Sequence, residues 1–257
     1  MTKIIAILGV DGAGKTTFLN QLQSELSANA QVQILKMPQY HLTPGTSRPN
    51  LSEALDRLSQ HADRAGDPAL KAMSLFLAMP LYGEAVTMLS GNAKWIISER
   101  HPLIDSIAYS AFYKSLMGAS FDWKKLADFE SIALVMDWAQ KVMSRWLKKS
   151  DISKLPAHMA ELFSNSPKEL VPQLKHIYRC DYPDEAILIA VDRDMLEARL
   201  NAKGTGREIH EDLSTILMLQ EALKATAQLV VQLSDKTKLR VIDASELKRD
   251  EILLTIS

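Results

Sequence analysis

The sequence lacks the cysteines that small secreted domains use for disulfide bonds. It has one cysteine, Cys180, in 257 residues, so no disulfide forms within the chain. It also lacks a run of about 18 apolar residues, the length that a membrane-spanning helix needs. The apolar start of the chain is too short for a secretory signal peptide. We therefore expect a cytoplasmic protein that does not associate with a membrane.

A strong charge of either sign is also missing. The 30 Lys and Arg residues nearly balance the 31 Asp and Glu residues, which leaves a net charge of −1 at pH 7. This balance argues against a broad polyanion-binding surface, so we expect no nucleic-acid polymer as a partner. A small phosphate ligand needs only local positive charge and is compatible with this composition. The length of the chain suits an α/β domain with a sizeable core.

The stretch Gly9–Thr17 carries the most specific pattern in the chain. It reads G-V-D-G-A-G-K-T-T and fits G-x-x-x-x-G-K-[ST], the pattern of a phosphate-binding loop. Residues 3–8 before it form a short apolar run with the length of a buried strand. After it, apolar residues recur at helical spacing at Phe18, Leu19, Leu22 and Leu26. Because strand, loop and helix agree, a glycine-rich turn without a ligand is the weaker alternative.

The residue types in this loop suit a nucleotide phosphate with Mg²⁺. Glycines let successive backbone N–H groups point at one anion, and the N-terminus of the following helix adds a positive field. Lys15 is expected to reach the β- and γ-phosphates, and the Thr16 hydroxyl is expected to bind Mg²⁺. The predicted nucleotide-binding residues are Gly9, Asp11, Gly12, Ala13, Gly14, Lys15, Thr16 and Thr17.

Strands and helices alternate along the rest of the chain. Further strands are expected at residues 31–37, 94–98, 186–191 and 239–242. Helices are expected at residues 51–64, 70–89 with a kink at Pro80, 103–117, 128–148, 196–201, 213–233 and 246–254. The segment from Gly118 to Cys180 reads as helical and carries no motif. This alternation predicts an α/β fold with a parallel five-stranded sheet covered by helices.

Glu99 and Arg100 follow the strand expected at residues 94–98. The carboxyl ends of the strands are where ligands bind in open α/β sheets. Glu99 is expected to hold the hydration shell of Mg²⁺ or a substrate hydroxyl, and the fork of Arg100 to grip a phosphate. The alternative is an exposed ion pair without a ligand.

A second group of cations surrounds Gly204 and Gly206. It consists of Arg199, Lys203 and Arg207, and the glycines would let the segment at about 199–212 move as a lid. Phosphoryl transfer needs positive charge on the migrating group. Because Ala13 in the phosphate loop carries no charge, the lid is the expected source. The alternative is a solvated basic helix end.

These motifs resemble two families of nucleotide-modifying enzymes. Gly9–Thr17 resembles the phosphate loop of thymidylate kinases, including its Asp-Gly pair. Glu99–Gly118 resembles the D-R-H-P segment of herpesviral thymidine kinases. Weaker similarities cover the lid, Val241–Ser245, residues 66–68 and residues 79–82, so that only residues 121–181 lie outside the resemblance.

The resemblance implies a three-layer P-loop kinase fold formed as one domain by residues 1–257, with residues 121–181 as an added helical segment. It implies ATP and Mg²⁺ as cofactors. By the same resemblance, Asp11 holds a sugar hydroxyl, Arg100 binds the acceptor end, and the lid cations bind the transferred phosphoryl group.

The sequence departs from the nucleoside kinases of this group at two places. Those enzymes carry a glutamate next to a proline after the second strand, where it acts as general base. Here Pro38 lies between Met37 and Gln39, so no carboxylate stands beside it. A phosphate acceptor is already an anion and needs no base, which favours a nucleoside monophosphate. The glutamine that reads thymine in the viral enzymes falls near Ser74 or Leu75, so the base is not assigned.

These observations predict ATP- and Mg²⁺-dependent phosphoryl transfer to a nucleoside monophosphate, as in thymidylate kinases. The alternatives are a thymidine-like nucleoside kinase, a nucleotide-binding protein without turnover, and a kinase for a non-nucleotide molecule. A small-molecule nucleotide or nucleoside is the expected partner, and the oligomeric state, a homodimer included, is left open. The predicted catalytic residues are Lys15, Glu99, Arg100 and Arg207, and the predicted Mg²⁺ ligands are Thr16 and Glu99.

Overall fold

The structure, a computed structural model, describes residues 2–26, 31–147, 151–203 and 213–245. The chain groups into two compact units, which we describe separately. The sheet unit consists of residues 1–37, 89–108 and 182–257, and the helical unit consists of residues 38–88 and 109–181. That residues 1–257 form one kinase domain stays a prediction. The helix expected at residues 246–254 lies outside the described residues.

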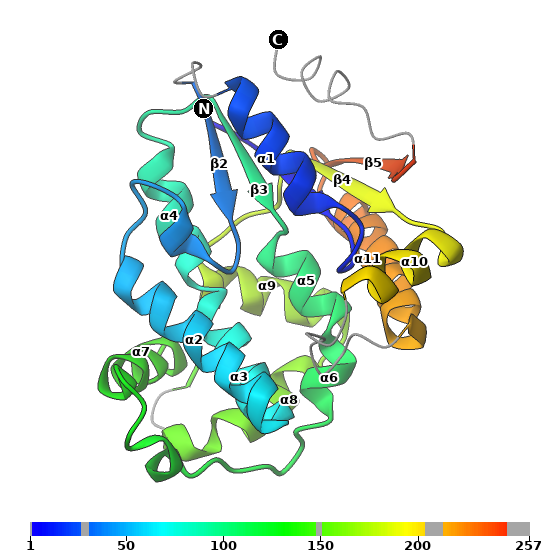
Figure 1. Cartoon of the computed structure of the whole chain (residues 1–257). Helices are drawn as coiled ribbons and strands as arrows, with labels where there is room; N and C mark the ends of the chain where they lie inside the picture. The colour runs from blue at the N-terminus through cyan, green and yellow to red at the C-terminus, as the bar shows by residue number, and fades with distance from the viewer. Residues whose placement is uncertain (1, 27–30, 148–150, 204–212, 246–257) are drawn as a thin grey trace. The chain divides into compact units, whose positions relative to one another are not determined.

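The sheet unit is built on five parallel strands, as predicted. They are β1 (Lys3–Leu8), β2 (Val32–Lys36), β3 (Trp95–Glu99), β4 (Glu185–Ala190) and β5 (Lys238–Asp243). Their order across the sheet is β2-β3-β1-β4-β5, and every neighbouring pair is parallel (Figure 1). Residues 5–8 of the central strand β1 are fully buried. A strand covered on both faces requires a continuous apolar run, which is why β1 was recognisable in the sequence.

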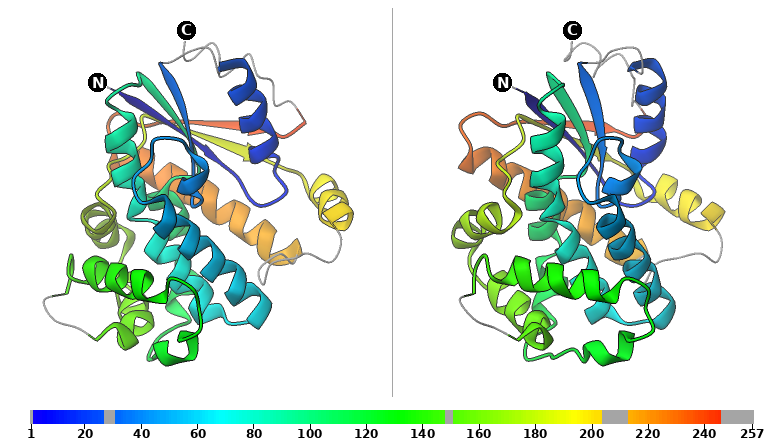
Figure 2. Two further views of the ribbon diagram at one scale, coloured as in Figure 1. Left: turned by 60° about the vertical axis from the view of Figure 1, so that its left-hand side comes forward. Right: turned by 90° about the vertical axis from the view of Figure 1, so that its left-hand side faces the viewer.

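Helices cover both faces of this sheet. The helices of the sheet unit are α1 (Lys15–Leu26), α5 (Pro102–Ala108), α10 (Arg193–Lys203) and α11 (Leu213–Leu233). Helix α1 packs on β2 and β3, whereas α11 packs on β4, β5 and α5. Figure 2 shows α1 and α11 on opposite faces of the sheet. The predicted three-layer α/β fold is confirmed.

The parallel arrangement brings the carboxyl ends of the strands to one edge of the sheet. Ile7 of β1 lies opposite Glu99 of β3, and Ala190 of β4 lies opposite Asp243 of β5. The phosphate loop follows β1 directly, so it shares this edge with Glu99. An edge of this kind is where ligands bind in open α/β sheets.

The helical unit contains the added helical segment. Its helices are α2 (Pro49–Ala65), α3 (Pro68–Ala78), α4 (Leu81–Leu89), α6 (Ser110–Lys114), α7 (Ile132–Met143), α8 (Leu155–Phe163) and α9 (Pro167–Tyr178), with short 3₁₀ turns at Tyr40–Leu42, Trp123–Leu126 and Ile152–Lys154. Aromatic rings form its centre: the ring of Phe76 lies 5.4–6.4 Å from the rings of Tyr113, Trp146, Phe163 and Tyr178. Phe76 connects α3 to the helices that follow residue 109.

Two helices that the sequence predicts as continuous are divided. Residues 70–89 form α3 and α4 instead of one kinked helix, because Pro80 has no N–H to donate and the chain turns there. Residues 103–117 form α5 and α6, because the backbone of Tyr109 has a φ of −86° and a ψ of 9° and so leaves the helical region.

A third predicted helix is shorter than expected. Residues 128–148 contain α7 only, from Ile132 to Met143. Ser131 precedes it with a φ of 69°, a left-handed conformation that stops the helix from beginning earlier. Because this residue is a serine and not a glycine, the sequence does not indicate the left-handed conformation.

One helical stretch, Pro68–Leu89, is long and apolar enough by length and composition to cross a membrane. It comprises α3 and α4, and 72 % of its most apolar window is buried inside the protein. Such burial is typical of a core helix. No other stretch among the described residues passes the same test.

Candidate functional site

The loop between β1 and α1 has a backbone that only glycine adopts without strain. Gly12 and Gly14 have φ angles of 83° and 96°. At Gly9, a Cβ atom would lie 3.0 Å from the carbonyl oxygen of Ile189 and 3.1 Å from the Cβ of Ala13. The glycines of the pattern are therefore explained by close approach of the backbone and by left-handed turns.

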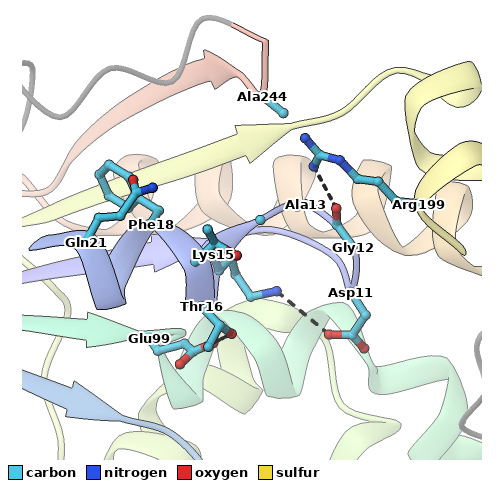
Figure 3. A pocket seen from close by; sticks show the side chains of 12 residues that line it. Asp11, Gly12, Ala13, Lys15, Thr16, Phe18, Gln21, Glu99, Arg199 and Ala244 are labelled. Carbon is cyan, nitrogen blue, oxygen red and sulfur yellow. Dashed lines mark hydrogen bonds and ion pairs between the residues drawn. The ribbon is translucent and has the colours of Figure 1, made fainter. Parts of the chain in front are cut away.

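The loop borders an open pocket of about 620 Å³ in the sheet unit (Figure 3). Seven of the eight predicted nucleotide-binding residues line it, and Gly9 does not. The lining residues are Asp11, Gly12, Ala13, Gly14, Lys15, Thr16, Thr17, Phe18, Gln21, Glu99, Arg199 and Ala244. Residues from the loop after β1, from α1, β3 and α10, and from the end of β5 thus meet at one edge of the sheet.

Lys15 is buried beneath the loop, with 5 % of its side chain exposed. Its Nζ donates a hydrogen bond of 2.8 Å to the carbonyl oxygen of Val10 and lies 3.8 Å from Oδ1 of Asp11. Burial and, to a smaller extent, the nearby charge of Arg100 lower the pKa of Lys15 to about 8, although Asp11 and Glu99 oppose the shift. A buried cation bound mainly to a backbone carbonyl is placed to accept an anion in exchange.

The two predicted Mg²⁺ ligands are in contact. The hydroxyl of Thr16 donates a hydrogen bond of 2.8 Å to Oε1 of Glu99, across the gap between α1 and β3 (Figure 3). No group of three or more His, Cys, Asp or Glu side chains is placed to hold a metal in the described part of the chain. This donor set fits Mg²⁺, which usually takes one or two protein oxygens and completes its shell with water and phosphate.

Arg100 lies between two carboxylates. Its Nη2 donates to Oδ1 of Asp11 at 2.6 Å, and its Nη1 lies 3.4 Å from Oδ2 of Asp105. The backbone of Arg100 has a φ of 70°, a conformation rare for a residue with a Cβ atom. Such strain at the end of a strand beside a pocket is typical of functional sites.

Asp105 is the residue of this group that the sequence analysis missed. It lies in α5 with 5 % of its side chain exposed, and its buried Oδ1 has no hydrogen-bond partner among the described residues. Burial raises the pKa of Asp105, while the charges of Arg100 and Lys15 oppose the shift. An acidic residue inside the otherwise apolar run P-L-I-D-S-I was the signal that could have found it.

Arg199 is the member of the predicted lid that the structure places at the pocket. Its Nη1 donates a hydrogen bond of 2.8 Å to the carbonyl oxygen of Gly12 (Figure 3). Arg207, predicted to be catalytic, lies outside the described residues, as do Gly204 and Gly206. The side chain of Lys203 is outside them as well.

The structure also adds a carboxylate beside Gln39, in the helical unit. The amide nitrogen of Gln39 donates to Oδ1 of Asp56 at 3.2 Å, and Oδ2 of Asp56 accepts a bond of 3.0 Å from Gln60. Gln39, the residue after Pro38, is therefore in contact with a carboxylate of α2. No local pattern signals this contact, because Gln39 and Asp56 belong to different elements.

The sequence matches no model of a known protein family and none of the curated proteins. Among solved structures, the fold is similar to that of a thymidylate kinase from Candida albicans. The similarity covers 99 % of this chain and 89 % of that protein, with a TM-score of 0.50 and 15 % sequence identity. At this identity the comparison establishes the P-loop α/β fold and not the activity.

Proposed function

We propose that the protein transfers a phosphoryl group from ATP to a nucleoside monophosphate, with Mg²⁺, as thymidylate kinases do. The observation that carries this proposal is the pocket in which buried Lys15, the glycine loop and the Thr16–Glu99 pair meet. The similar fold of the Candida albicans thymidylate kinase supports the same function. The likeness of Glu99–Gly118 to herpesviral thymidine kinases remains a resemblance of sequence.

The phosphate loop would hold the phosphates of ATP. Lys15 would exchange its hydrogen bond to the Val10 carbonyl for phosphate oxygens, and the backbone N–H groups at Gly12 and Gly14 would add donors. Helix α1 begins at Lys15, so the dipole of α1 adds positive potential where the phosphates would bind.

Thr16 and Glu99 would hold Mg²⁺, either directly or through water. When bound, the ion neutralises charge on the phosphate oxygens. The existing hydrogen bond between Thr16 and Glu99 keeps both oxygens close to the loop, so little rearrangement is needed.

Arg100 would bind the phosphate of the acceptor. Its guanidinium is held between Asp11 and Asp105, so its donors are oriented before the acceptor arrives. A positioned arginine suits a phosphate because its fork matches two oxygens at once. Arg199 and Arg207 remain the proposed cations for the transferred group.

A nucleoside is the second candidate acceptor. A hydroxyl acceptor profits from a general base, and such help is worth roughly 10²–10⁴-fold. Asp56, whose carboxylate accepts a hydrogen bond from Gln39, is the residue to test for this role. Two further candidate functions are nucleotide binding without turnover and phosphorylation of a non-nucleotide molecule.

The test is a coupled ADP-release assay over a panel of nucleosides and nucleoside monophosphates at fixed ATP and Mg²⁺. The proposal expects the highest kcat/KM for a monophosphate, and turnover lost in the Lys15→Ala variant. If a nucleoside is the better substrate and Asp56→Asn removes that activity, the second candidate replaces the first. ATP binding without turnover of any acceptor would favour a non-catalytic nucleotide-binding protein.

A further inference from the structure

Two arginines, Arg48 and Arg145, lie over one buried tryptophan in the helical unit, and the charge of a third, Arg179, acts on Arg145. We call Arg48, Arg145 and Arg179, together with Trp138 and Glu84, the arginine cluster. The guanidinium carbons of Arg48 and Arg145 lie 5.3 and 5.1 Å from the centre of the Trp138 ring. Trp138 is 2 % exposed, and its Nε1 donates to the carbonyl oxygen of Leu77 at 2.7 Å, so the ring is a fixed support for both arginines.

The positive charge of the cluster exceeds its negative charge. Nε of Arg48 donates to Oε2 of Glu84 at 2.9 Å, and Nη1 of Arg145 donates to the backbone carbonyl of Ile177 at 2.7 Å. The guanidinium of Arg179 makes no hydrogen bond or ion pair within the described residues. Among the described residues, the cluster thus has one carboxylate, that of Glu84, and three arginines.

The excess of positive charge in the cluster contributes to a lowered pKa at Arg145. Burial lowers the pKa of Arg145, and the charges of Arg179 and Arg48 lower it further, while Glu84 opposes them. The carboxylate of Asp181, two residues after Arg179, is paired with Lys175 and not with an arginine of the cluster. Among the described residues, the positive charges of the three arginines thus outnumber the carboxylates of the cluster.

Two of the three arginines occupy helix ends that favour other residues. Arg179 is the C-cap of α9, with φ 53° and ψ 43°, and Arg48 is the N-cap of α2, with φ 55° and ψ 48°. Glycine is preferred for a left-handed end of a helix, and Ser, Thr, Asp or Asn for an N-cap. Arg48 makes no capping hydrogen bond with its side chain. At both positions the backbone is strained, and an arginine stands where one of the preferred residues would relieve or avoid that strain.

A close contact between two helices brings Arg179 to the cluster. A Cβ atom on Gly83 of α4 would lie 2.2 Å from the carbonyl oxygen of Arg179 and 2.6 Å from that of Tyr178. Only glycine lets the end of α9 approach α4 this closely. The contact places the backbone of Arg179 against Gly83, the residue before Glu84.

We propose that the arginine cluster binds a small oxyanion with two or more negative charges, of the phosphate monoester or diphosphate class. Such an anion supplies the missing negative charge, and guanidinium groups bind phosphate oxygens in pairs. Packing on Trp138 explains Arg48 and Arg145 but leaves the strained Arg179 without a role. All members belong to the helical unit and none lines the phosphate-loop pocket, so the proposal does not depend on the proposed function.

The test measures pyrophosphate binding by titration calorimetry in the Lys15→Ala variant, in which the phosphate loop is disabled. The indole N–H resonance of Trp138, assigned with Trp138→Phe, reports whether the anion reaches the cluster. Adding Arg179→Gly should weaken binding at least tenfold and raise Tm, because glycine suits the left-handed end of α9. Arg48→Asn should weaken binding as well and serves if the first variant fails to fold.

The matched control is Arg64→Ala, which removes one exposed positive charge from α2 outside the cluster. It should leave pyrophosphate binding unchanged. Equal weakening by Arg64→Ala would show a general charge effect and overturn the proposal. Pyrophosphate binding that is absent in Lys15→Ala, or unchanged by Arg179→Gly, would overturn it as well. Titration of inorganic phosphate and of ADP in the same variants distinguishes a free anion from the phosphates of a nucleotide.

Discussion

The phosphate-loop pocket and the arginine cluster both concentrate positive charge, but they balance it differently. In the pocket, Arg100 is held between Asp11 and Asp105, and glycines carry most of the backbone strain. In the cluster, arginines themselves occupy the strained positions, and Glu84 is their one acidic partner among the described residues. A balanced group is positioned before its ligand arrives, whereas an unbalanced group stores repulsion that a ligand relieves.

The difference has a practical meaning for substitutions. In the pocket, a lost side chain removes a contact that the proposed reaction needs. In the cluster, replacing Arg179 by glycine should relieve strain and repulsion, so stability should rise while binding falls. The predictions below test each side of this comparison, from the largest expected effect to the smallest.

Lys15→Ala should abolish measurable turnover, a loss of at least about 10³-fold, because the loop then has no cation beneath the phosphates. The fold should persist, since burial disfavours the charged lysine in the free protein. An ADP-release assay measures the turnover, and circular dichroism measures whether the fold is retained. Unchanged ATP affinity and activity in a folded variant would contradict the proposed role of the loop.

Arg207→Ala should lower kcat by roughly 10³-fold with little change in ATP affinity, because its charge matters most during transfer. Steady-state kinetics and equilibrium binding of ATP separate the two effects. Arg199→Ala is the comparison, since Arg199 contacts Gly12 in the free protein. Normal turnover of the Arg207 variant combined with a loss in the Arg199 variant would assign the role to Arg199.

Asp105→Asn should raise KM for the acceptor about 10–100-fold and leave KM for ATP unchanged, because Arg100 loses one of its two carboxylate partners. Steady-state measurement of KM for ATP and for the acceptor tests this prediction. Asp137→Asn removes an exposed carboxylate from α7 and should have no effect. A rise of both KM values would show that Asp105 supports the whole pocket and not Arg100 alone.

Gly83→Ala should destabilise the protein by about 1–3 kcal/mol, because the added methyl group meets the backbone carbonyls of α9. Urea unfolding monitored by Trp fluorescence measures the change. Gly45→Ala is the comparison for a left-handed glycine, since Gly45 has a φ of 80° and nothing lies within 4 Å of the added atom there. A Gly83→Ala variant as stable as the unsubstituted protein would contradict the close contact between α4 and α9.

The affinity for ATP should fall as pH rises above about 8, at most tenfold per pH unit. The pKa of Lys15 is about 8 in the free protein, and bound phosphates stabilise the protonated form, so binding takes up a proton above that pH. Titrations from pH 7 to 9.5 measure the effect. Lys15→Arg, whose side chain stays protonated, should remove it, and an identical pH profile in that variant would contradict the assignment.

The sequence by itself determined the elements whose signals are local. The apolar run of β1, the glycine pattern after it and the periodicity of α11 each lie within one continuous stretch, and the described structure agrees with all three. The helix boundaries at Tyr109 and Ser131 could not be predicted from the sequence. Both residues leave the helical region of backbone conformation, and neither is a glycine or a proline.

Only the tertiary structure decided which distant side chains meet. The contact of Asp11 with Arg100 depends on two strands lying side by side, and that of Asp56 with Gln39 depends on how α2 folds back. The arginine cluster requires the approach of α9 to Gly83. Patterns along a chain report backbone periodicity and loop geometry, whereas pairing between elements depends on packing, which no single stretch encodes.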